Sequence, residues 1–220
     1  MNIYDIIGPV MVGPSSSHTA GAVRIGLLSR KLMDENIIKA DIFLHGSFYA
    51  TGKGHGTDLA LVAGLLGMKE DDDRIPSSFH IAEELELQYS FSGIILRDVH
   101  PNSALLKLTG ISGKYMEIIG SSLGGGRIMI NQIDGLNVNF SGNYPTLIVH
   151  NIDEPGHIAD VTAMLSHKSI NIAQMQLYRD GRGGNAVMVI ECDQEVPYES
   201  VKWLEKVEGV VKVSYLSLLD

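Results

Sequence analysis

The chain has 220 residues, of which 45% are hydrophobic and 20% are charged, so it is long enough for one large or two small domains. Its 17 basic and 26 acidic side chains give a net charge of −9, which argues against a nucleic-acid partner because phosphates need a basic surface. The single cysteine, Cys192, excludes an internal disulfide and any zinc or iron–sulfur site made wholly of thiolates from one copy.

No apolar run approaches the roughly 20 residues that a membrane helix needs, so we expect no membrane partner. Residues 1–5 show no basic segment followed by an apolar one, which is the pattern of an export signal. We therefore expect a cytoplasmic location.

The first notable segment is residues 13–19, which read Gly-Pro-Ser-Ser-Ser-His-Thr and precede a predicted amphipathic helix over residues 20–34. A helix N-terminus has unpaired N–H groups and a positive dipole, so this loop favours carboxylate or phosphate. His18 is the one group in the loop that exchanges a proton near neutral pH. An ordinary N-cap needs only one hydroxyl, so four hydroxyls and an imidazole favour a functional site.

A predicted strand over residues 40–45 leads into a glycine-rich polar connection, residues 46–58, and then into a predicted helix over residues 59–66. His55 lies in this connection between two glycines, shortly after Lys53. Glycines let a ligand approach the backbone, and an imidazole placed there can act as an acid or a base. The spacing of a nucleotide-binding phosphate loop is absent. On its own, a histidine in a loop is most simply a surface residue. Because the same chain also carries the serine-rich loop with His18, we consider His55 a candidate for proton transfer.

The remainder of the first part alternates short apolar runs with turns that contain Gly and Asn, which predicts a meander of strands and an α+β domain. Residues 71–78 have turn chemistry. Residues 121–127, Ser-Ser-Leu-Gly-Gly-Gly-Arg, fit either a plain hairpin or a nest of amides for an anion. The predicted strands cover residues 93–99, 104–109, 115–120 and 127–133.

Turn residues at 139–145 mark the better domain boundary, so we predict a first domain over residues 1–142 and a second over residues 143–220. The second domain has the order βαββαβ, typical of a ferredoxin-like sheet with two helices on one face. Residues 181–184 supply its central hairpin. The predicted elements are strands at 146–150, 171–178, 186–192 and 210–216 and helices at 156–167 and from Pro197 to Gly209.

Two short motifs connect this second domain with a known family. Residues 151–156 read Asn-Ile-Asp-Glu-Pro-Gly, and residues 169–172 read Ser-Ile-Asn-Ile. The domain thereby resembles an ACT domain, a small module that binds amino acids for regulation. The resemblance implies that Asn151, Asp153 and Asn171 hold the ammonium and carboxylate of an amino acid such as L-serine, commonly between two copies, and it implies homodimerisation. Asp153 as a simple helix cap is the alternative.

The first domain carries a second resemblance, through Ile7-Gly8-Pro9, the serine-rich loop, Gly46-Ser47, the glycine-flanked His55 and three glycines at 124–126. These motifs closely resemble the beta subunit of iron–sulfur-dependent bacterial L-serine dehydratase. The family converts L-serine to pyruvate and ammonia through an aminoacrylate. The resemblance implies a separate alpha subunit whose cysteines hold a four-iron four-sulfur cluster, with none of its iron ligated by Cys192 and no metal ligand on this chain; potassium is an additional candidate cofactor.

The resemblance also assigns roles to single residues. His18 and His55 are the candidates for proton transfer, and which of them is the base stays open. The same domain type is used for anion or effector binding in certain phosphoglycerate dehydrogenases, so the serine-rich loop can serve the active site, an effector pocket or both. A free-standing amino-acid sensor without a cluster-bearing partner is the alternative function. The substrate-binding candidates are Ser15, Ser16, Ser17, Thr19, Lys53 and Gly54.

Overall fold

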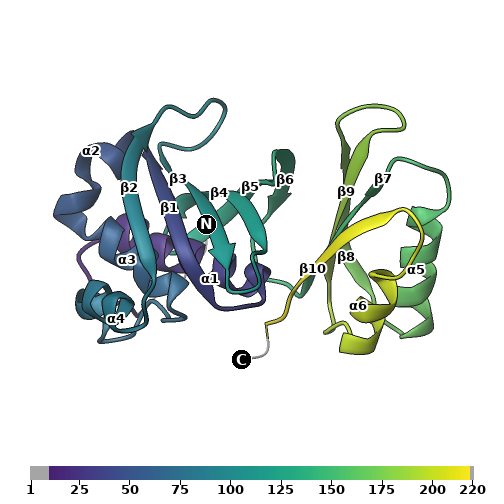
Figure 1. The fold of residues 1–220 in the computed structure, drawn as a ribbon, viewed down its shortest axis with the longest axis horizontal. Helices are drawn as coiled ribbons and strands as arrows, with labels where there is room; N and C mark the ends of the chain where they lie inside the picture. The colour runs from purple at the N-terminus through teal and green to yellow at the C-terminus, as the bar shows by residue number, and fades with distance from the viewer. Residues whose placement is uncertain (1–9, 219–220) are drawn as a thin grey trace. The chain divides into compact units, whose positions relative to one another are not determined.

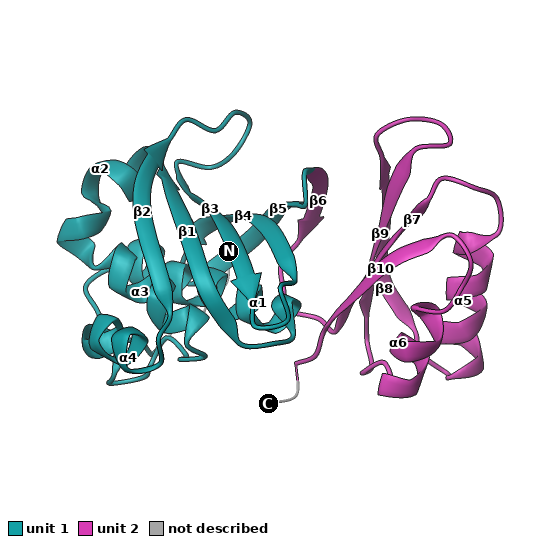
Figure 2. Ribbon diagram, viewed as in Figure 1, with its two compact units in different colours: residues 1–135 teal, residues 136–220 magenta. Residues whose placement is uncertain are grey.

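The computed structural model of the chain describes residues 10–218, so Ile7, Gly8 and Pro9 and residues 1–5 lie outside the described part. The chain divides into two compact units, residues 1–135 and residues 136–220 (Figure 2). This division falls before the predicted boundary at 142/143, which stays a prediction. Within residues 10–218, no helix is both long and apolar enough to cross a membrane.

Strands in the order β2-β1-β3-β4-β5 form a mixed sheet at the base of the first unit (Figure 1), and the residues of β6 belong to the second unit (Figure 2). β1 pairs in parallel with β2 and antiparallel with β3, and the β3, β4 and β5 strands continue as an antiparallel meander. The predicted α+β fold is confirmed, and the predicted meander is confirmed for its last three strands, whereas β2 lies next to β1. The strands are β1 (Ile37–His45), β2 (Gln88–Ile94), β3 (Asn102–Gly110), β4 (Tyr115–Gly124), β5 (Arg127–Ile133) and β6 (Leu136–Phe140).

Helix α1 (Gly21–Met33) is the predicted first helix, and the π-helical turn η2 (Ser16–Ala20) precedes it. The buried face of α1 carries Ile25 and Leu32, and the helix packs on β4 and on α3 (Thr57–Leu65). Both helices follow a candidate histidine, so their packing brings His18 and His55 to the same end of the sheet, near the C-terminal end of β1.

The glycine-rich segment after β1 differs from its predicted form, because it is the helix α2 (Gly46–His55). Phe48 is fully buried, and Gly46 adopts φ 55° where a Cβ would lie 2.5 Å from the Pro101 carbonyl oxygen. Burial of the aromatic ring therefore outweighs the low helix propensity of the glycines. His55 is the last residue of this helix and Gly56, with φ 67°, separates it from α3.

Two further differences lie nearby. The strand predicted at 93–99 is wrong for most of its length, because β2 covers Gln88–Ile94 and shares only residues 93 and 94 with it. The turn segment 71–78 contains the 3-10 turn η3 (Ile75–Ser77) and leads into the unpredicted helix α4 (Ser78–Glu84). The ranges of β3 and β5 agree with the predictions. β4 and β5 form a hairpin in which Gly124, Gly125 and Gly126 all have positive φ, and the nest of amides for an anion stays a prediction.

The second unit contains the predicted βαββαβ order, with a sheet of strand order β10-β7-β9-β8 and both helices on one face (Figure 1). Its core is built from Leu147, Leu165, Met188, Ile190 and Leu204, all buried. The ferredoxin-like arrangement implied by the ACT resemblance is confirmed. The elements are β7 (Thr146–Ile152), α5 (His157–His167), β8 (Ile172–Arg179), β9 (Asn185–Cys192), α6 (Tyr198–Leu204) and β10 (Val210–Leu216).

Candidate functional site

His18 is the centre of a hydroxyl cluster built from η2 and α2. Its Nε2 atom lies 3.0 Å from Ser47 Oγ and 3.1 Å from Thr51 Oγ1. The two hydroxyls lie 3.3 Å apart, and Thr51 Oγ1 also donates to the Ser47 carbonyl oxygen at 3.0 Å. Ser15 Oγ is 3.5 Å from Nδ1 of the same ring, at the limit of a hydrogen bond. The imidazole of His18 is therefore held in one orientation.

The structure brings the two candidate histidines together. The ring centroids of His18 and His55 are 4.9 Å apart, and the ring of Phe48 lies 5.5 Å from His18 on another side. Thr19 Oγ1 donates to the carbonyl oxygen of His55 at 3.1 Å, which fixes the end of α2 against η2. Two imidazoles therefore share one hydroxyl-lined place, although they come from segments far apart in sequence.

The pKa of His18 is lowered from its usual value of 6.5. Burial is the largest cause because it penalises the charged ring, and the nearby His55 adds electrostatic repulsion, while an interaction with the Ser47 backbone acts in the opposite direction. His18 is therefore neutral near pH 7, and a neutral imidazole can accept a proton.

The serine-rich loop uses its hydroxyls in different ways. Ser15 is the cap of η2 and accepts a hydrogen bond from the His18 backbone N–H at 3.1 Å. Thr19 is buried, and a Cβ on Gly13 would lie 2.5 Å from its methyl group, so this turn requires glycine. Ser16 and Ser17 are half-buried. Ser15 and Thr19 thus build the loop, while Ser16 and Ser17 are better placed to meet a ligand.

Lys53 and Gly54 are exposed in the last turn of α2, directly before His55. A Cβ on Gly54 would meet no atom within 4 Å, so packing within the described chain does not require glycine there. The space next to Gly54 therefore leaves room for a substrate to approach the neighbouring residue, His55.

Two residues of this cluster were not predicted as site residues. Ser47 and Thr51 are one helical turn apart and face the same nitrogen of His18. The i,i+4 spacing is a usable signal once residues 46–55 are recognised as a helix. A row of polar side chains crosses β3, β4 and β5 in the same unit: buried Ser103 Oγ lies 2.6 Å from buried Ser121 Oγ, which donates to half-buried Asn131 Oδ1 at 2.5 Å.

Metal-ligating side chains do not gather in the part of the chain that the structure describes. Among residues 10–218, no group of three or more His, Cys, Asp or Glu side chains is arranged to hold a metal ion. Cys192 is buried in the second unit, where burial and then the neighbouring Asp193 raise the pKa of its thiol to about 11. A thiol held in the protonated form is a poor metal ligand.

The predicted effector residues of the second unit have separate partners. Asn151 is buried and donates from Nδ2 to the Ile152 carbonyl oxygen at 2.6 Å. Asp153 Oδ2 accepts from the backbone N–H of Gly183 at 3.1 Å and from Arg179 Nη1 at 2.9 Å. These two contacts, the Gly183 N–H first, lower the pKa of Asp153.

Asn171 lies at the other end of the sheet from Asn151 and Asp153. It precedes β8, whose first residue pairs with Cys192, whereas Ile152 pairs with Asn185 at the opposite end of β9. The Asn171 amide donates to Asp193 Oδ2 at 2.6 Å. One copy of the chain therefore does not bring the three predicted effector residues together, and a shared ligand would need residues from two copies.

Comparison with known proteins gives consistent matches. A family model described as serine dehydratase beta chain matches residues 2–132. The chain is 39% identical over 216 residues to the probable L-serine dehydratase beta chain of Bacillus subtilis, covering 98% of each. It is 38% identical over 200 residues to the L-serine dehydratase beta chain of Peptoniphilus asaccharolyticus, covering 90% of each. A D-3-phosphoglycerate dehydrogenase of Methanocaldococcus jannaschii is 31% identical over 113 residues, which are 51% of this chain and 22% of that protein.

Proposed function

Because this chain belongs to the serine dehydratase beta-chain family, we propose that it works as the beta subunit of a two-chain L-serine dehydratase that forms pyruvate and ammonia. The observation that carries the proposal is the His18–His55 pair, 4.9 Å between ring centroids, at the hydroxyl cluster of Ser47 and Thr51. Proton transfer and carboxylate binding are the tasks that such groups perform.

The reaction has an elimination step, in which a base removes a proton from serine, and a hydrolysis step. The Cα proton of serine is removed and the Cβ hydroxyl leaves with a proton as water, which forms aminoacrylate. Water then adds and ammonia leaves, which gives pyruvate. We assign the removal of the Cα proton to His55, because its ring has no hydrogen bond to the described residues, whereas His18 is held by Ser47 and Thr51. A neutral His18 beside His55 avoids a second positive charge in the site.

Substrate binding falls to the loop that begins α1. Ser16 and Ser17 lie at the start of a helical segment, where a carboxylate is favoured by the dipole and by unpaired N–H groups. Lys53, exposed beside His55, adds a positive charge. The proposed orientation places the serine carboxylate at this loop and its Cα toward His55.

We further propose that the four-iron four-sulfur cluster is held entirely by a separate alpha subunit in the cytoplasm. The donor set supports this division, because the thiol of Cys192 is buried and protonated. Potassium is an additional cofactor to test by ion replacement in the assembled enzyme.

The test is anaerobic co-expression with a candidate alpha subunit followed by an assay of pyruvate. His55→Ala should abolish turnover in the complex while iron content and the absorbance of the cluster stay unchanged. His80→Ala is the matched control, because His80 is an exposed histidine of the same unit. Near-normal kcat in His55→Ala would contradict the assignment of the base.

Regulation is proposed for the second unit. L-serine would bind between two copies through Asn151, Asp153 and Asn171, which requires a homodimer of this unit and couples ligand binding to assembly or activity. A colourless homodimer that binds amino acids and never co-purifies with a cysteine-rich partner would favour the alternative of a free-standing sensor.

A further inference from the structure

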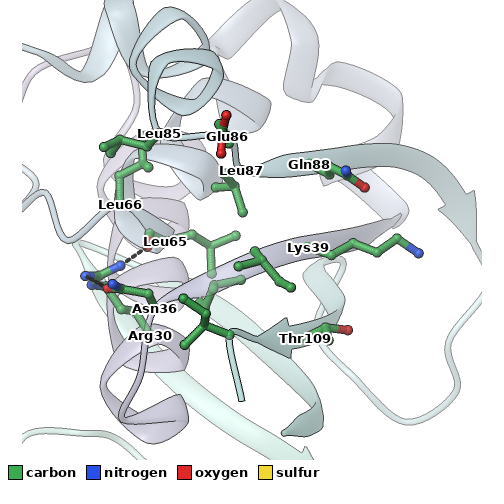
Figure 3. A pocket seen from close by; sticks show the side chains of 13 residues that line it. Arg30, Asn36, Lys39, Leu65, Leu66, Leu85, Glu86, Leu87, Gln88 and Thr109 are labelled. Atoms are coloured by element: carbon green, nitrogen blue, oxygen red, sulfur yellow. Dashed lines mark hydrogen bonds between the residues drawn. The ribbon is translucent and has the colours of Figure 1, made fainter. Parts of the chain in front are cut away.

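A pocket of about 930 Å³ lies in the first unit, at the end of the sheet where β1 and β2 begin (Figure 3). The candidate active site lies at the other end of β1, beyond His45, so the pocket is separate from it. Pockets that bind small molecules in proteins have volumes of roughly 300–1,000 Å³, so the space suits a small ligand.

The pocket wall combines an apolar part with a polar part of nearly equal area. Leu65, Leu87 and Ile37 are buried and form the inner surface. Leu85 and Ile111 lie at the rim and are 65% and 69% exposed, which leaves large aliphatic side chains in water. An aliphatic ligand that covers these side chains would remove apolar surface from water, which is favourable.

Arg30 provides a fixed cation at one end of this pocket (Figure 3). Its Nη1 donates to the Leu65 carbonyl oxygen at 3.0 Å, and its Nη2 donates to Asn36 Oδ1 at 3.4 Å. A guanidinium has five N–H donors, so these two contacts hold the group in place and leave other donors for a ligand. Gly67 has φ 92°, and a Cβ added there would lie 3.3 Å from Arg30 Nε, so a side chain at this position would crowd the guanidinium.

The other charged groups of the pocket limit the number of anionic groups that a ligand can carry. Lys39 is paired with Asp41 at 2.7 Å, so the nearby carboxylate offsets its attraction for a further anion. Glu86 contributes a negative charge to the lining and would repel a second anion. One anionic group at Arg30, followed by an apolar tail, is the ligand pattern that matches these charges.

We propose that this pocket binds a monocarboxylate with an aliphatic tail. The carboxylate pairs with the guanidinium of Arg30, which matches carboxylate geometry with two parallel hydrogen bonds. The tail lies on Leu65 and Leu87 and reaches the rim at Leu85. The site is independent of the histidine pair and of serine turnover.

The test is isothermal titration calorimetry of the full chain with octanoate. Octanol has the same tail without the charge, and acetate has the charge without the tail. Octanoate should bind, and both octanol and acetate should bind at least about tenfold more weakly, because each lacks one half of the recognition. Equal affinity for octanol and octanoate, or no heat with octanoate below its micelle concentration, would overturn the proposal.

Two variants place the binding in this pocket. Arg30→Met keeps the aliphatic stem and should weaken octanoate binding by about tenfold or more, while Arg74→Met, which alters an exposed arginine paired with Asp72, should leave it unchanged. Unchanged octanoate affinity in a folded Arg30→Met would refute the assignment.

Leu85 offers a second variant because Arg30 also supports the fold through Leu65. Leu85 is exposed at the rim, so Leu85→Asp should not disturb the core. The added carboxylate should weaken octanoate binding more than the neutral Leu85→Asn does, and the difference should shrink in high salt. Equal affinities of these two variants would also count against a carboxylate at this site.

Discussion

At the scale of single residues, the hydroxyls of Ser47 and Thr51 orient the ring of His18. We predict that Ser47→Ala combined with Thr51→Ala lowers kcat by roughly 10-fold or more, since each hydrogen bond lost is worth about 1 kcal/mol. KM for L-serine should change little, because these hydroxyls contact His18. The measurement is steady-state pyruvate formation by the complex with the alpha subunit.

The control for this double variant is Ser166→Ala, which removes an exposed hydroxyl of the second unit. A large rise in KM with unchanged kcat would mean that Ser47 and Thr51 bind the substrate itself.

The lowered pKa of His18 predicts how stability depends on pH. In the unfolded chain the group titrates near 6.5, and in the folded chain it titrates lower, so the unfolded chain binds more protons in that interval. The stability contributed by the neutral ring is therefore present above pH 6.5 and is lost as the pH falls through the folded pKa. His18→Gln should reduce the loss of unfolding free energy between about pH 7.5 and about pH 5.

Urea denaturation of the full chain at the two pH values measures this difference. His80→Gln, which alters an exposed histidine, should retain the pH dependence of the unaltered chain. If the unfolding free energy of His18→Gln depends on pH as strongly as that of the unaltered chain, the lowered pKa of His18 does not cause this pH dependence.

Sequence patterns identified the histidines but not their partners. His18 and His55 stand out because each lies among residues suited to ligand approach. Ser47 and Thr51 lie 29 and 33 residues from His18 in sequence, and only the packing of α2 against η2 makes them neighbours. Contacts between distant segments depend on tertiary packing, which local spacing does not encode.

At the scale of elements, a close crossing of α1 and α3 sets the distance between the two histidines. A Cβ on Gly26 would lie 2.3 Å from the Leu61 carbonyl oxygen, and one on Gly64 would lie 2.1 Å from the Val23 carbonyl oxygen. Both clashes are with backbone, which cannot move aside as a side chain can. We predict that Gly64→Ala destabilises the chain by about 1–3 kcal/mol or more, the cost of overpacking.

Thermal or urea unfolding of the full chain measures the effect of Gly64→Ala. Gly181→Ala is the control, because an added Cβ there meets no atom within 4 Å. Loss of turnover should accompany the loss of stability, since α1 and α3 follow His18 and His55. A Gly64→Ala chain as stable as the control would show that the helices cross less closely.

Element prediction succeeded where hydrophobic periodicity is strong and failed where tertiary burial overrides propensity. The helix before residue 34 and the strands at 127–133 and 210–216 follow clear apolar patterns. The segment 46–55 contains several glycines and was interpreted as an irregular connection, yet the burial of Phe48 stabilises it as α2. Helix α4 has only seven residues and begins at the end of the turn segment 71–78, so it is too short for its apolar residues to show a helical period.

At the scale of the whole molecule, the proposed effector site needs two chains, because Asn171 lies at the opposite end of the sheet from Asp153. We predict that Asp153→Ala and Asn171→Ala each weaken L-serine binding to the second unit by about tenfold or more. Calorimetry on the full chain measures both. Asn137→Ala, which alters an exposed residue of β6, is the control and should bind as the unaltered chain does.

Mixing the two variants distinguishes a shared site from a site within one chain. In a mixed dimer, the Asp153 of one copy and the Asn171 of the other are both intact in one of the two sites. Random exchange makes half of the dimers mixed, so about a quarter of all effector sites should recover the original affinity. If a single chain supplied all three residues, every copy would carry one defect and no site would recover, which would exclude the two-copy arrangement.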